Sequence, residues 1–215
     1  MNITNEDNME LMARYEDNYF DLAIVDPPYG IERFKKCSTK DIEGATTVKS
    51  KRIAERFQKM ETVNNNKPNK KYWKELFRVS KNQIVWGANN FNLPVSEYFL
   101  VWDKKQAMPN FARCELAYVS MGLKTPAKIF EYSIHKHNQV EKIHSTQKPV
   151  SLYEFCLMNY AKEGNKILDT HLGSGSIAIA CHNLGYDLTA CELDKEYYEA
   201  AMKRINQHKQ QLTMF

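Results

Sequence analysis

No stretch of the sequence approaches the roughly 18 to 20 consecutive apolar residues that a membrane-spanning helix needs. The opening residues 1–7 are mostly polar, which is not typical of a secretory signal peptide. These two absences argue against a membrane protein and against a secreted one. We therefore expect a soluble, cytoplasmic protein with no membrane partner.

The residues that commonly bind metals show no spacing typical of a metal site. The sequence has five cysteines, which are Cys37, Cys114, Cys156, Cys181 and Cys191. No two of them form a Cys-x-x-Cys pair, and an odd, scattered set indicates reduced thiols. His135 and His137 alternate as they would on one face of an extended segment, and a surface pair is a better interpretation than a metal site. The sequence therefore predicts no metal.

The net charge is small, at +4, with a sequence pI near 8.6. This balance permits an anionic partner, but many proteins without one share it. With 215 residues, 43% of them hydrophobic, the chain can bury one continuous core. The sequence contains no internal repeat, and we expect a single domain spanning residues 1–215.

Short apolar runs alternate along the chain with segments of helical spacing. The expected strands are 20–25, 83–87, 98–104, 114–120, 166–169 and 186–192, and the expected helices are 72–79, 150–158, 174–181 and 195–211. Such alternation favours the α/β class, with a mostly parallel central sheet covered by helices on both faces.

A glycine turn follows the expected strand at 166–169 and opens the next helix. Gly173 and Gly175 permit a close backbone approach, and Glu192 closes the following strand, where a carboxylate can accept both hydroxyls of a ribose. The third glycine of a dinucleotide site and the lysine of a triphosphate site are missing, which disfavours NAD and ATP. S-adenosylmethionine fits these features, although the glycines alone could simply allow tight helix packing.

A second turn, Asp26-Pro27-Pro28-Tyr29, ends the apolar run at 20–25. Two prolines stop the strand there, because they remove backbone donors. A turn of this kind can simply end a strand. Its position nevertheless indicates a site, since open parallel sheets bind ligands beyond the carboxyl ends of their strands.

Three further segments accompany this turn: 111–117 (Phe-Ala-Arg-Cys-Glu-Leu-Ala), 144–149 (His-Ser-Thr-Gln-Lys-Pro) and 169–176 (Asp-Thr-His-Leu-Gly-Ser-Gly-Ser). In this order and combination, the chain resembles the amino-group DNA methyltransferases of the beta arrangement, in which the catalytic motif precedes the cofactor motif. The match spans nearly the whole chain. It implies a Rossmann-like, S-adenosylmethionine-dependent methyltransferase fold.

The resemblance also gives individual residues a role in binding the cofactor. Thr146 and Lys148 would help to hold its methionine part. Ser145 stands where proline is common, and Thr170-His171 stands where Pro-Phe is common, so His171 is either a cofactor contact or a packed or loop histidine. The implied cofactor-binding residues are Thr146, Lys148, Asp169, His171, Gly173, Ser174, Gly175 and Glu192.

The catalytic residues implied by the resemblance are Asp26, Pro27, Pro28 and Tyr29. The target base would be flipped out, its amino group would donate to the Asp26 carboxylate and the Pro27 carbonyl, and Tyr29 would stack on the base. Aspartate at the first position is typical of N6-adenine enzymes, whereas serine is commoner in N4-cytosine enzymes and asparagine in protein-glutamine enzymes. We predict methylation of N6 of adenine in DNA, with N4-cytosine, an RNA target and an inactive DNA-binding relative left open.

A basic insertion at 31–71 follows the catalytic turn. We expect Lys51, Arg52 and Arg56 to contact DNA phosphates, the alternative being a solvated helix face. Residues 120–144 leave no room for a sizeable target-recognition domain, so a homodimer could supply the missing surface. The resemblance implies a bacterial or phage protein, and restriction-modification, phage self-protection and standalone methylation are all compatible with it.

Overall fold

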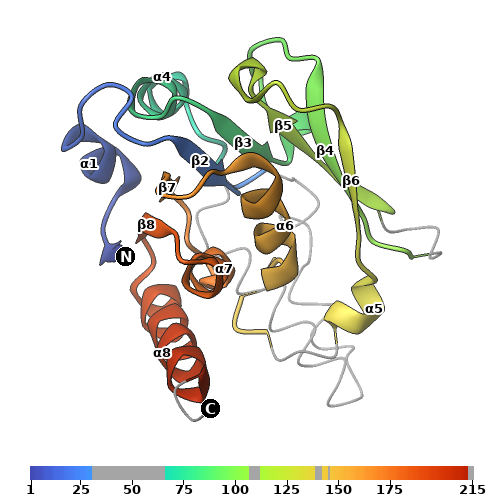
Figure 1. The fold of residues 1–215 in the computed structure, drawn as a ribbon. Coiled ribbons are helices and arrows are strands. Elements are labelled where there is room, and N and C mark those ends of the chain that lie inside the picture. Colours follow the sequence, from blue (N-terminus) through green and yellow to red (C-terminus); the bar gives the residue numbers. More distant parts are fainter. Residues whose placement is uncertain (31–65, 107–111, 139–141, 145, 213–215) are drawn as a thin grey trace, which may run out of the picture.

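The computed structural model describes residues 1–30, 66–106, 112–138, 142–144 and 146–212. Its centre is an eight-stranded sheet with the strand order β1-β8-β7-β2-β3-β5-β4-β6 (Figure 1). The strands are β1 (Asn2–Asn5), β2 (Leu22–Val25), β3 (Gln83–Trp86), β4 (Tyr98–Asp103), β5 (Cys114–Val119), β6 (Lys128–Glu131), β7 (Lys166–Asp169) and β8 (Asp187–Glu192).

The sheet is mostly parallel, as predicted. Every pairing between neighbouring strands is parallel except those of β5, which runs antiparallel to both β3 and β4. The carboxyl ends of the other strands therefore share one edge of the sheet, and β5 has its first residues at that edge. This reversal brings residues from the start of a strand to the edge where ligands bind.

Helices cover the sheet from both sides (Figure 1). Two core clusters lie on opposite faces: one joins the sheet to α6, α7 and α8, and the other joins it to α1 and α4. The α-helices are α1 (Asn8–Ala13), α4 (Lys70–Val79), α5 (Ile134–His137), α6 (Val150–Tyr160), α7 (Ser176–Leu184) and α8 (Lys195–Leu212), and two short 3-10 helices are η2 (Ala88–Asn90) and η3 (Met121–Leu123).

Strand β2 shows why the sheet needs both layers. Leu22 and Ile24 belong to the cluster on the α6 side, whereas Ala23 and Val25 belong to the cluster on the α4 side. All four side chains are buried. A strand whose alternate residues face two different helical layers is apolar throughout, which is what the run at 20–25 predicted.

Helix α4 begins two residues earlier than the helix predicted at 72–79. The Asn69 side chain caps it, accepting hydrogen bonds from the backbone N–H groups of Lys71 and Tyr72 at 2.9 and 3.1 Å. Tyr72, Leu76 and Val79 then face the sheet. The cap signal lay within a run of asparagines interpreted as a turn, so the boundary was missed.

Several short elements were not predicted. Strand β1 is a half-exposed edge strand, and α1, capped by Asp7, is only six residues long, so neither has a strong apolar period. The interpretation of His135 and His137 as a surface pair on an extended segment was wrong. They belong to α5, and His137 is buried, with its Nε2 2.6 Å from the carbonyl oxygen of Gln147.

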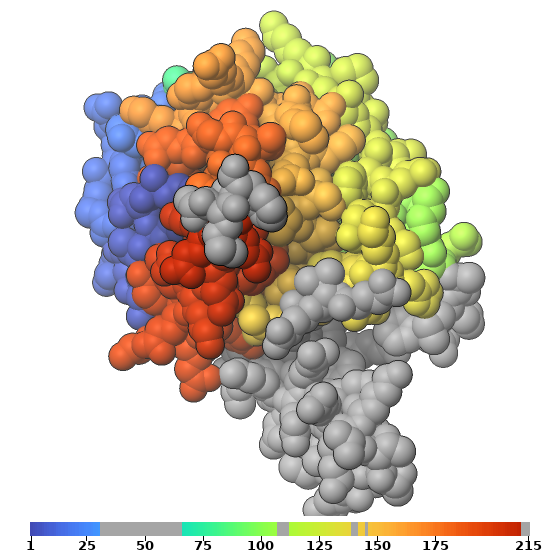
Figure 2. Space-filling model, turned by 60° about the horizontal axis from the view of Figure 1, so that its bottom comes forward, coloured from blue at the N-terminus to red at the C-terminus, as the bar shows by residue number. Residues whose placement is uncertain are grey.

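The two ends of the described chain lie on the same side of the molecule. Strand β1 pairs with β8, and Figure 2 shows the blue N-terminal and the red C-terminal segments side by side on the surface. Among the residues that the structure describes, no helix is long and apolar enough to cross a membrane.

Candidate active site

The carboxyl ends of β2 and β7 meet at the topological switch point of the sheet. These two strands are hydrogen-bonded neighbours, but the chain continues from β2 to β3 on one side and from β7 to β8 on the other. Open α/β sheets bind ligands at such points. Asp26 directly follows β2 and Asp169 is the last residue of β7, so both predicted motifs reach this position.

The turn after β2 forms a compact polar cluster around the Asp26 carboxylate. The Tyr29 hydroxyl donates to Oδ1 of Asp26 at 2.6 Å, and the Lys148 ammonium lies 2.5 Å from Oδ2. The same ammonium also donates to the Tyr29 hydroxyl oxygen at 3.1 Å. Burial, together with the nearby carboxylate of Asp26, raises the pKa of Tyr29 well above its ordinary value. Tyr29 is therefore a neutral hydrogen-bond donor at physiological pH.

Gly87 makes room for the Tyr29 ring. This residue follows β3 with a φ of +71°, and a Cβ atom there would lie 2.2 Å from Cε1 of Tyr29. Its backbone N–H donates to the Leu116 carbonyl at 2.9 Å, which fixes the turn. Phe91 then contacts Tyr29 edge-on, with ring centroids 6.0 Å apart. The ring is thus held by a glycine turn and an aromatic neighbour.

Two further charged residues extend the cluster along the edge of the sheet. The Lys148 ammonium lies 3.3 Å from Oε2 of Glu115, and the Lys104 ammonium lies 2.5 Å from Oε1. Burial alone would raise the pKa of Glu115, but the two ammonium groups hold it at about 2. Burial alone would lower the pKa of Lys148, yet the carboxylates of Asp26 and Glu115 raise it. Glu115 and Lys148 therefore both carry charge at neutral pH.

The glycine loop after β7 is anchored to the end of β8. One oxygen of the Glu192 carboxylate accepts from the Gly173 N–H at 2.8 Å, and the other accepts from the Asp194 N–H at 3.0 Å. Burial raises the pKa of Glu192. Each carboxylate oxygen can accept more than one hydrogen bond, so Glu192 keeps acceptor capacity for a ligand.

The two loop glycines meet different needs. At Gly175, which precedes α7, a Cβ atom would lie 2.9 Å from Cδ1 of Ile205, so this glycine permits the packing of α8. At Gly173 a Cβ atom would approach nothing closer than 3.8 Å, and the φ of +53° alone favours glycine. The helix-packing interpretation therefore explains Gly175, whereas a Cβ atom at Gly173 would make only ordinary van der Waals contacts.

Ser174 and Ser176 tie the loop to two other segments. The Ser176 hydroxyl donates to the backbone carbonyl of Lys148 at 2.8 Å. The Arg204 guanidinium on α8 donates to the Ser174 carbonyl at 2.8 Å and to the Ser176 hydroxyl oxygen at 3.0 Å. The backbone of Lys148 is therefore fixed against the glycine loop while its ammonium reaches the catalytic turn.

Asp169 and His171 lie at the start of the glycine loop. Burial, with smaller contributions from Asp26 and Glu192, raises the pKa of Asp169 to about 8, although its Oδ1 accepts from the His171 N–H at 2.9 Å. Burial lowers the pKa of His171 to about 4, so its ring is neutral at neutral pH.

The His171 ring lies among protein groups. The Asn8 amide nitrogen is 3.3 Å from Nε2 and can only donate, so Nδ1 carries the proton and donates to the Thr170 hydroxyl oxygen 2.9 Å away. The same Thr170 oxygen lies 2.7 Å from the Tyr72 hydroxyl. These contacts support the packed-histidine interpretation, and a cofactor contact for His171 stays a prediction.

Thr146 lies beside the same loop. It is exposed, and its hydroxyl is 3.1 Å from Nδ1 of His144. The His144 ring contacts Tyr197 on α8 at a centroid distance of 4.3 Å, and its Cδ2 atom would be 3.9 Å from a Cβ atom at Gly173. The fold thus brings the predicted cofactor segments at 144–149 and 169–176 together.

The sequence matches a family described as DNA methylase over residues 20–203, most of the chain. The chain belongs to this DNA methylase family. It is 24% identical to the type II methyltransferase M.BglII of Bacillus subtilis over 247 aligned residues. The alignment covers 95% of the present chain and 68% of M.BglII. It is 35% identical to M.HpaI of Haemophilus parainfluenzae over 82 residues, 38% of this chain but only 26% of M.HpaI.

Solved structures share the fold of the methylase chain. The M1.HpyAVI–SAM complex has a TM-score of 0.57 at 17% identity, covering 94% of this chain and 98% of that one. The PvuII DNA methyltransferase, described as cytosine-N4-specific, has a TM-score of 0.57 at 13% identity, covering 96% and 90%. These likenesses confirm the predicted fold class.

The sequence alone did not assign a role to some residues that the fold places at this site. Glu115 lies in the segment 111–117 that supported the family resemblance, and only that resemblance pointed to it. Lys104 and Gly87 gave no signal, because their importance depends on the reversed strand β5 and on the packing of Tyr29. The predicted DNA contacts Lys51, Arg52 and Arg56 lie outside the described residues.

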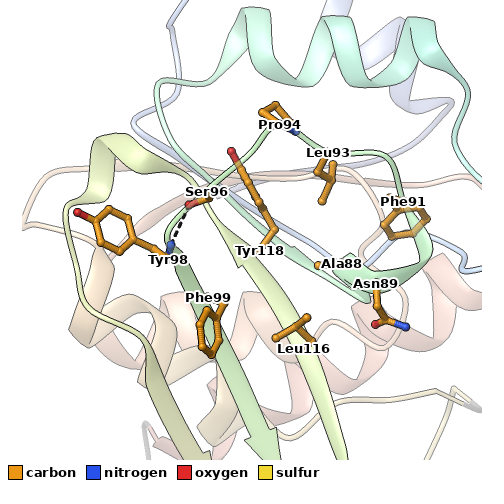
Figure 3. A pocket seen from close by; sticks show the side chains of 10 residues that line it. All are labelled: Ala88, Asn89, Phe91, Leu93, Pro94, Ser96, Tyr98, Phe99, Leu116 and Tyr118. Carbon is orange, nitrogen blue, oxygen red and sulfur yellow. Dashed lines mark hydrogen bonds between the residues drawn. The ribbon is translucent and has the colours of Figure 1, made fainter.

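A shallow hollow of about 440 Å³ lies next to this site on the α4 side of the sheet (Figure 3). Phe99 and Tyr118 from β4 and β5 lie in its floor, and Phe91, which contacts Tyr29, forms one wall. Its lining is Ala88, Asn89, Phe91, Leu93, Pro94, Ser96, Tyr98, Phe99, Leu116 and Tyr118. The charged groups of the catalytic turn are not part of it. Within the described residues, no cluster of His, Cys, Asp and Glu could hold a metal ion.

Proposed function

We propose that this chain transfers a methyl group from S-adenosylmethionine to the N6 amino group of adenine in DNA. The supporting observation is the position of Asp26. Its carboxylate lies at the end of β2, beside β7, which leads into the glycine loop held by Glu192. An acceptor for an amino group and a glycine loop suited to a nucleoside would thus act together at one switch point.

The residues of the glycine loop fit this cofactor. Glu192 presents a carboxylate, already held by two backbone N–H groups, to which ribose hydroxyls could donate. Gly173 has no side chain that would keep a ligand away from the loop backbone. When bound, S-adenosylmethionine supplies an electrophilic methyl group, and formation of the new N–C bond breaks the S–C bond and releases one proton from the nitrogen.

The chain's own contribution is to orient the amino group. An exocyclic amine is a weak nucleophile because its lone pair is delocalised into the ring. Hydrogen bonds from the amine to Asp26 and to the Pro27 carbonyl favour a pyramidal nitrogen with its lone pair free to attack. Pro27 is buried and Tyr29 is held by Gly87 and Phe91, so these groups are fixed before the base arrives.

The variant Asp26→Ala tests the catalytic half of the site separately from the cofactor half. Asp26→Ala should abolish transfer and leave the Kd for S-adenosylmethionine within about twofold, because Asp26 binds the base and not the ribose; removing such a polar contact commonly costs about 100- to 1000-fold in rate. Purified protein is incubated with labelled S-adenosylmethionine and unmethylated DNA, and the digested nucleosides are analysed by mass spectrometry. Full activity in Asp26→Ala would refute the proposal.

The N4 amino group of cytosine is the second candidate. The structural likeness to the PvuII enzyme, described as cytosine-N4-specific, favours it, whereas the aspartate at position 26 favours adenine. The same digest decides between them. N6-methyladenine supports the first target, and N4-methylcytosine would retain the mechanism but change the base.

We further propose that the basic segment binds DNA phosphates. Replacing Lys51, Arg52 and Arg56 with Glu should weaken DNA binding and flatten its salt dependence, since each lost phosphate contact removes a released counterion. Binding that keeps its strength and salt slope would contradict this. The short segment at 120–144 also leads us to propose a homodimer, which light scattering showing only monomer at high concentration would exclude.

The biological setting is also a proposal. The relatives M.BglII and M.HpaI are called type II methyltransferases. Their names support a role in restriction-modification, in the cytoplasm of a bacterium or of a phage-infected cell. Resistance of DNA from cells expressing the chain to a panel of restriction nucleases would reveal the modified site.

A further inference from the structure

Four alternating charges form a row across the catalytic edge of the sheet: Asp26, Lys148, Glu115 and Lys104. Within this row the Lys148 ammonium is shared, at 2.5 Å from Oδ2 of Asp26 and 3.3 Å from Oε2 of Glu115. Its side chain is only 4% exposed. Because so little water reaches it, both interactions are weakened less than they would be at a surface.

In the proposed reaction, the Asp26 carboxylate accepts a hydrogen bond from the target base and not only from Tyr29 and Lys148. The amino group of a flipped base would donate to Asp26, yet Oδ1 already accepts from the Tyr29 hydroxyl and Oδ2 from Lys148. An ammonium and an amino group are both N–H donors, and the charged one forms the stronger hydrogen bond. Each oxygen can accept a second hydrogen bond, but the ammonium is the stronger donor, so the base amine gains a better acceptor when Lys148 leaves Oδ2.

Glu115 provides a second carboxylate with which the Lys148 ammonium can pair. Its Oε1 is paired with Lys104, whereas its Oε2 is buried and makes no hydrogen bond within the described residues. Its recorded charged neighbour is the Lys148 ammonium at 3.3 Å, and a buried oxygen whose donor is that distant is weakly satisfied. Closing the gap to Lys148 from 3.3 Å to an ordinary charged hydrogen bond of about 2.8 Å would satisfy it.

We propose that Glu115 is a positioning residue, which takes Lys148 over from Asp26 when the target base enters. Until then, the Lys148 ammonium occupies the position at Oδ2 of Asp26 that the amino group of the base would take. This inference rests on the proposed methyl transfer. The Lys148 backbone stays fixed during the exchange, because its carbonyl accepts from the Ser176 hydroxyl.

Charge balance explains why two carboxylates are needed. A buried ammonium that moves between two carboxylates remains paired throughout, whereas one that leaves its only partner becomes an uncompensated buried charge. Lys104 neutralises Glu115 while Lys148 is on Asp26. Antiparallel β5 places Glu115 at this edge, since its first residues lie where the parallel strands end.

The test combines three variants: Glu115→Gln, Lys148→Met and the double variant. Glu115→Gln keeps the shape but removes the charge, so Lys148 stays on Asp26. We expect kcat to fall about tenfold or more, a barrier increase of about 1.4 kcal/mol. The KM for DNA and the Kd for S-adenosylmethionine should stay within twofold.

In the Lys148→Met background, Glu115→Gln should cause no further loss of kcat, because the ammonium that it would release is already absent. Thermal unfolding is measured for each variant, and Glu131→Gln, an exposed glutamate at the end of β6, is the control.

Each outcome decides something. The exchange of Lys148 is supported if Glu115→Gln lowers kcat in the wild-type background but not in the Lys148→Met background. An equal loss in both backgrounds, in step with thermal stability, shows a purely structural Glu115 and overturns this inference while leaving the methyl transfer intact. A wild-type protein that forms no methylated nucleoside overturns the proposed function, and this inference with it.

Discussion

Glu192 connects the glycine loop to the end of β8 through two backbone hydrogen bonds. We predict that Glu192→Ala weakens the binding of S-adenosylmethionine by about 1.5 to 3 kcal/mol, the usual value for a hydrogen bond to a charged group. Calorimetry measures the effect, and Glu199→Ala, an exposed residue of α8, is the matched control. Equal affinity in the two variants would mean that the ribose is not bound here.

Asp169 should make the stability of the chain depend on pH. Its pKa is about 8 in the folded chain, against an ordinary value of 3.8, so the folded chain holds a proton that the unfolded chain releases between these values. The free energy of unfolding should therefore fall as pH rises from about 4 to about 8, by at most about 1.4 kcal/mol per pH unit.

The substitution Asp169→Asn isolates this contribution. Asparagine resembles the protonated acid and can still accept from the His171 N–H. Urea unfolding of both proteins at pH 5 and pH 8 should show that the variant gains stability relative to the wild type at the higher pH. A difference that does not change with pH would show that Asp169 is ionised throughout.

At the scale of residues, the sequence predicted the motifs better than it predicted their contacts. Asp26 and Glu192 could be named as candidates because an aspartate before two prolines and an acidic strand end are local patterns. The proposed exchange of Lys148 between Asp26 and Glu115 could not be predicted from the sequence. It depends on the position of Glu115 and on the backbone fixed by Ser176. Those groups are distant in the chain and adjacent only in the fold.

At the scale of elements, the turn after β3 is a sensitive part of the site. We predict that Gly87→Ala lowers kcat by about tenfold or more, because the left-handed backbone resists a side chain and the new Cβ atom would overlap the Tyr29 ring. Cofactor affinity should change little, since β2 lies between the strand before Gly87 and the strand before the glycine loop. Gly164→Ala is a suitable control: it also has a positive φ, but no atom lies within 4 Å. Equal activity in both variants would contradict the role given to this turn.

Long buried elements were predictable and short edge elements were not. The run at 20–25 became β2 because both its faces are covered, and the predicted helix at 195–211 became α8. Strand β1 forms only because β8 offers a free edge, which no property of residues 2–5 reveals. The reversal of β5 was equally hidden, since a buried apolar strand reads the same in either direction.

At the scale of the whole molecule, cofactor binding should stabilise the entire fold. The glycine loop and Glu192 follow two central strands, so a ligand there is bound by the folded chain alone. Saturation at 100 times the Kd adds about 2.7 kcal/mol to the free energy of unfolding. Thermal unfolding with and without S-adenosylmethionine should show this in the wild type and in Asp26→Ala, and much less in Glu192→Ala at the same concentration. A shift confined to the wild type would mean that Asp26 takes part in cofactor binding.

The pairing of β2 with β7 has a consequence for protein engineering. The catalytic turn and the glycine loop meet through the sheet and through Lys148, not through the chain that joins them in sequence. A circularly permuted protein opened at the exposed residues 162–164 would carry the glycine loop before the catalytic turn, with every strand keeping its neighbours. Its new linker would have to run back along α8, whose 18 residues rise about 27 Å. If this permuted protein folds and methylates DNA, the order of the two motifs along the chain is independent of their positions in the fold.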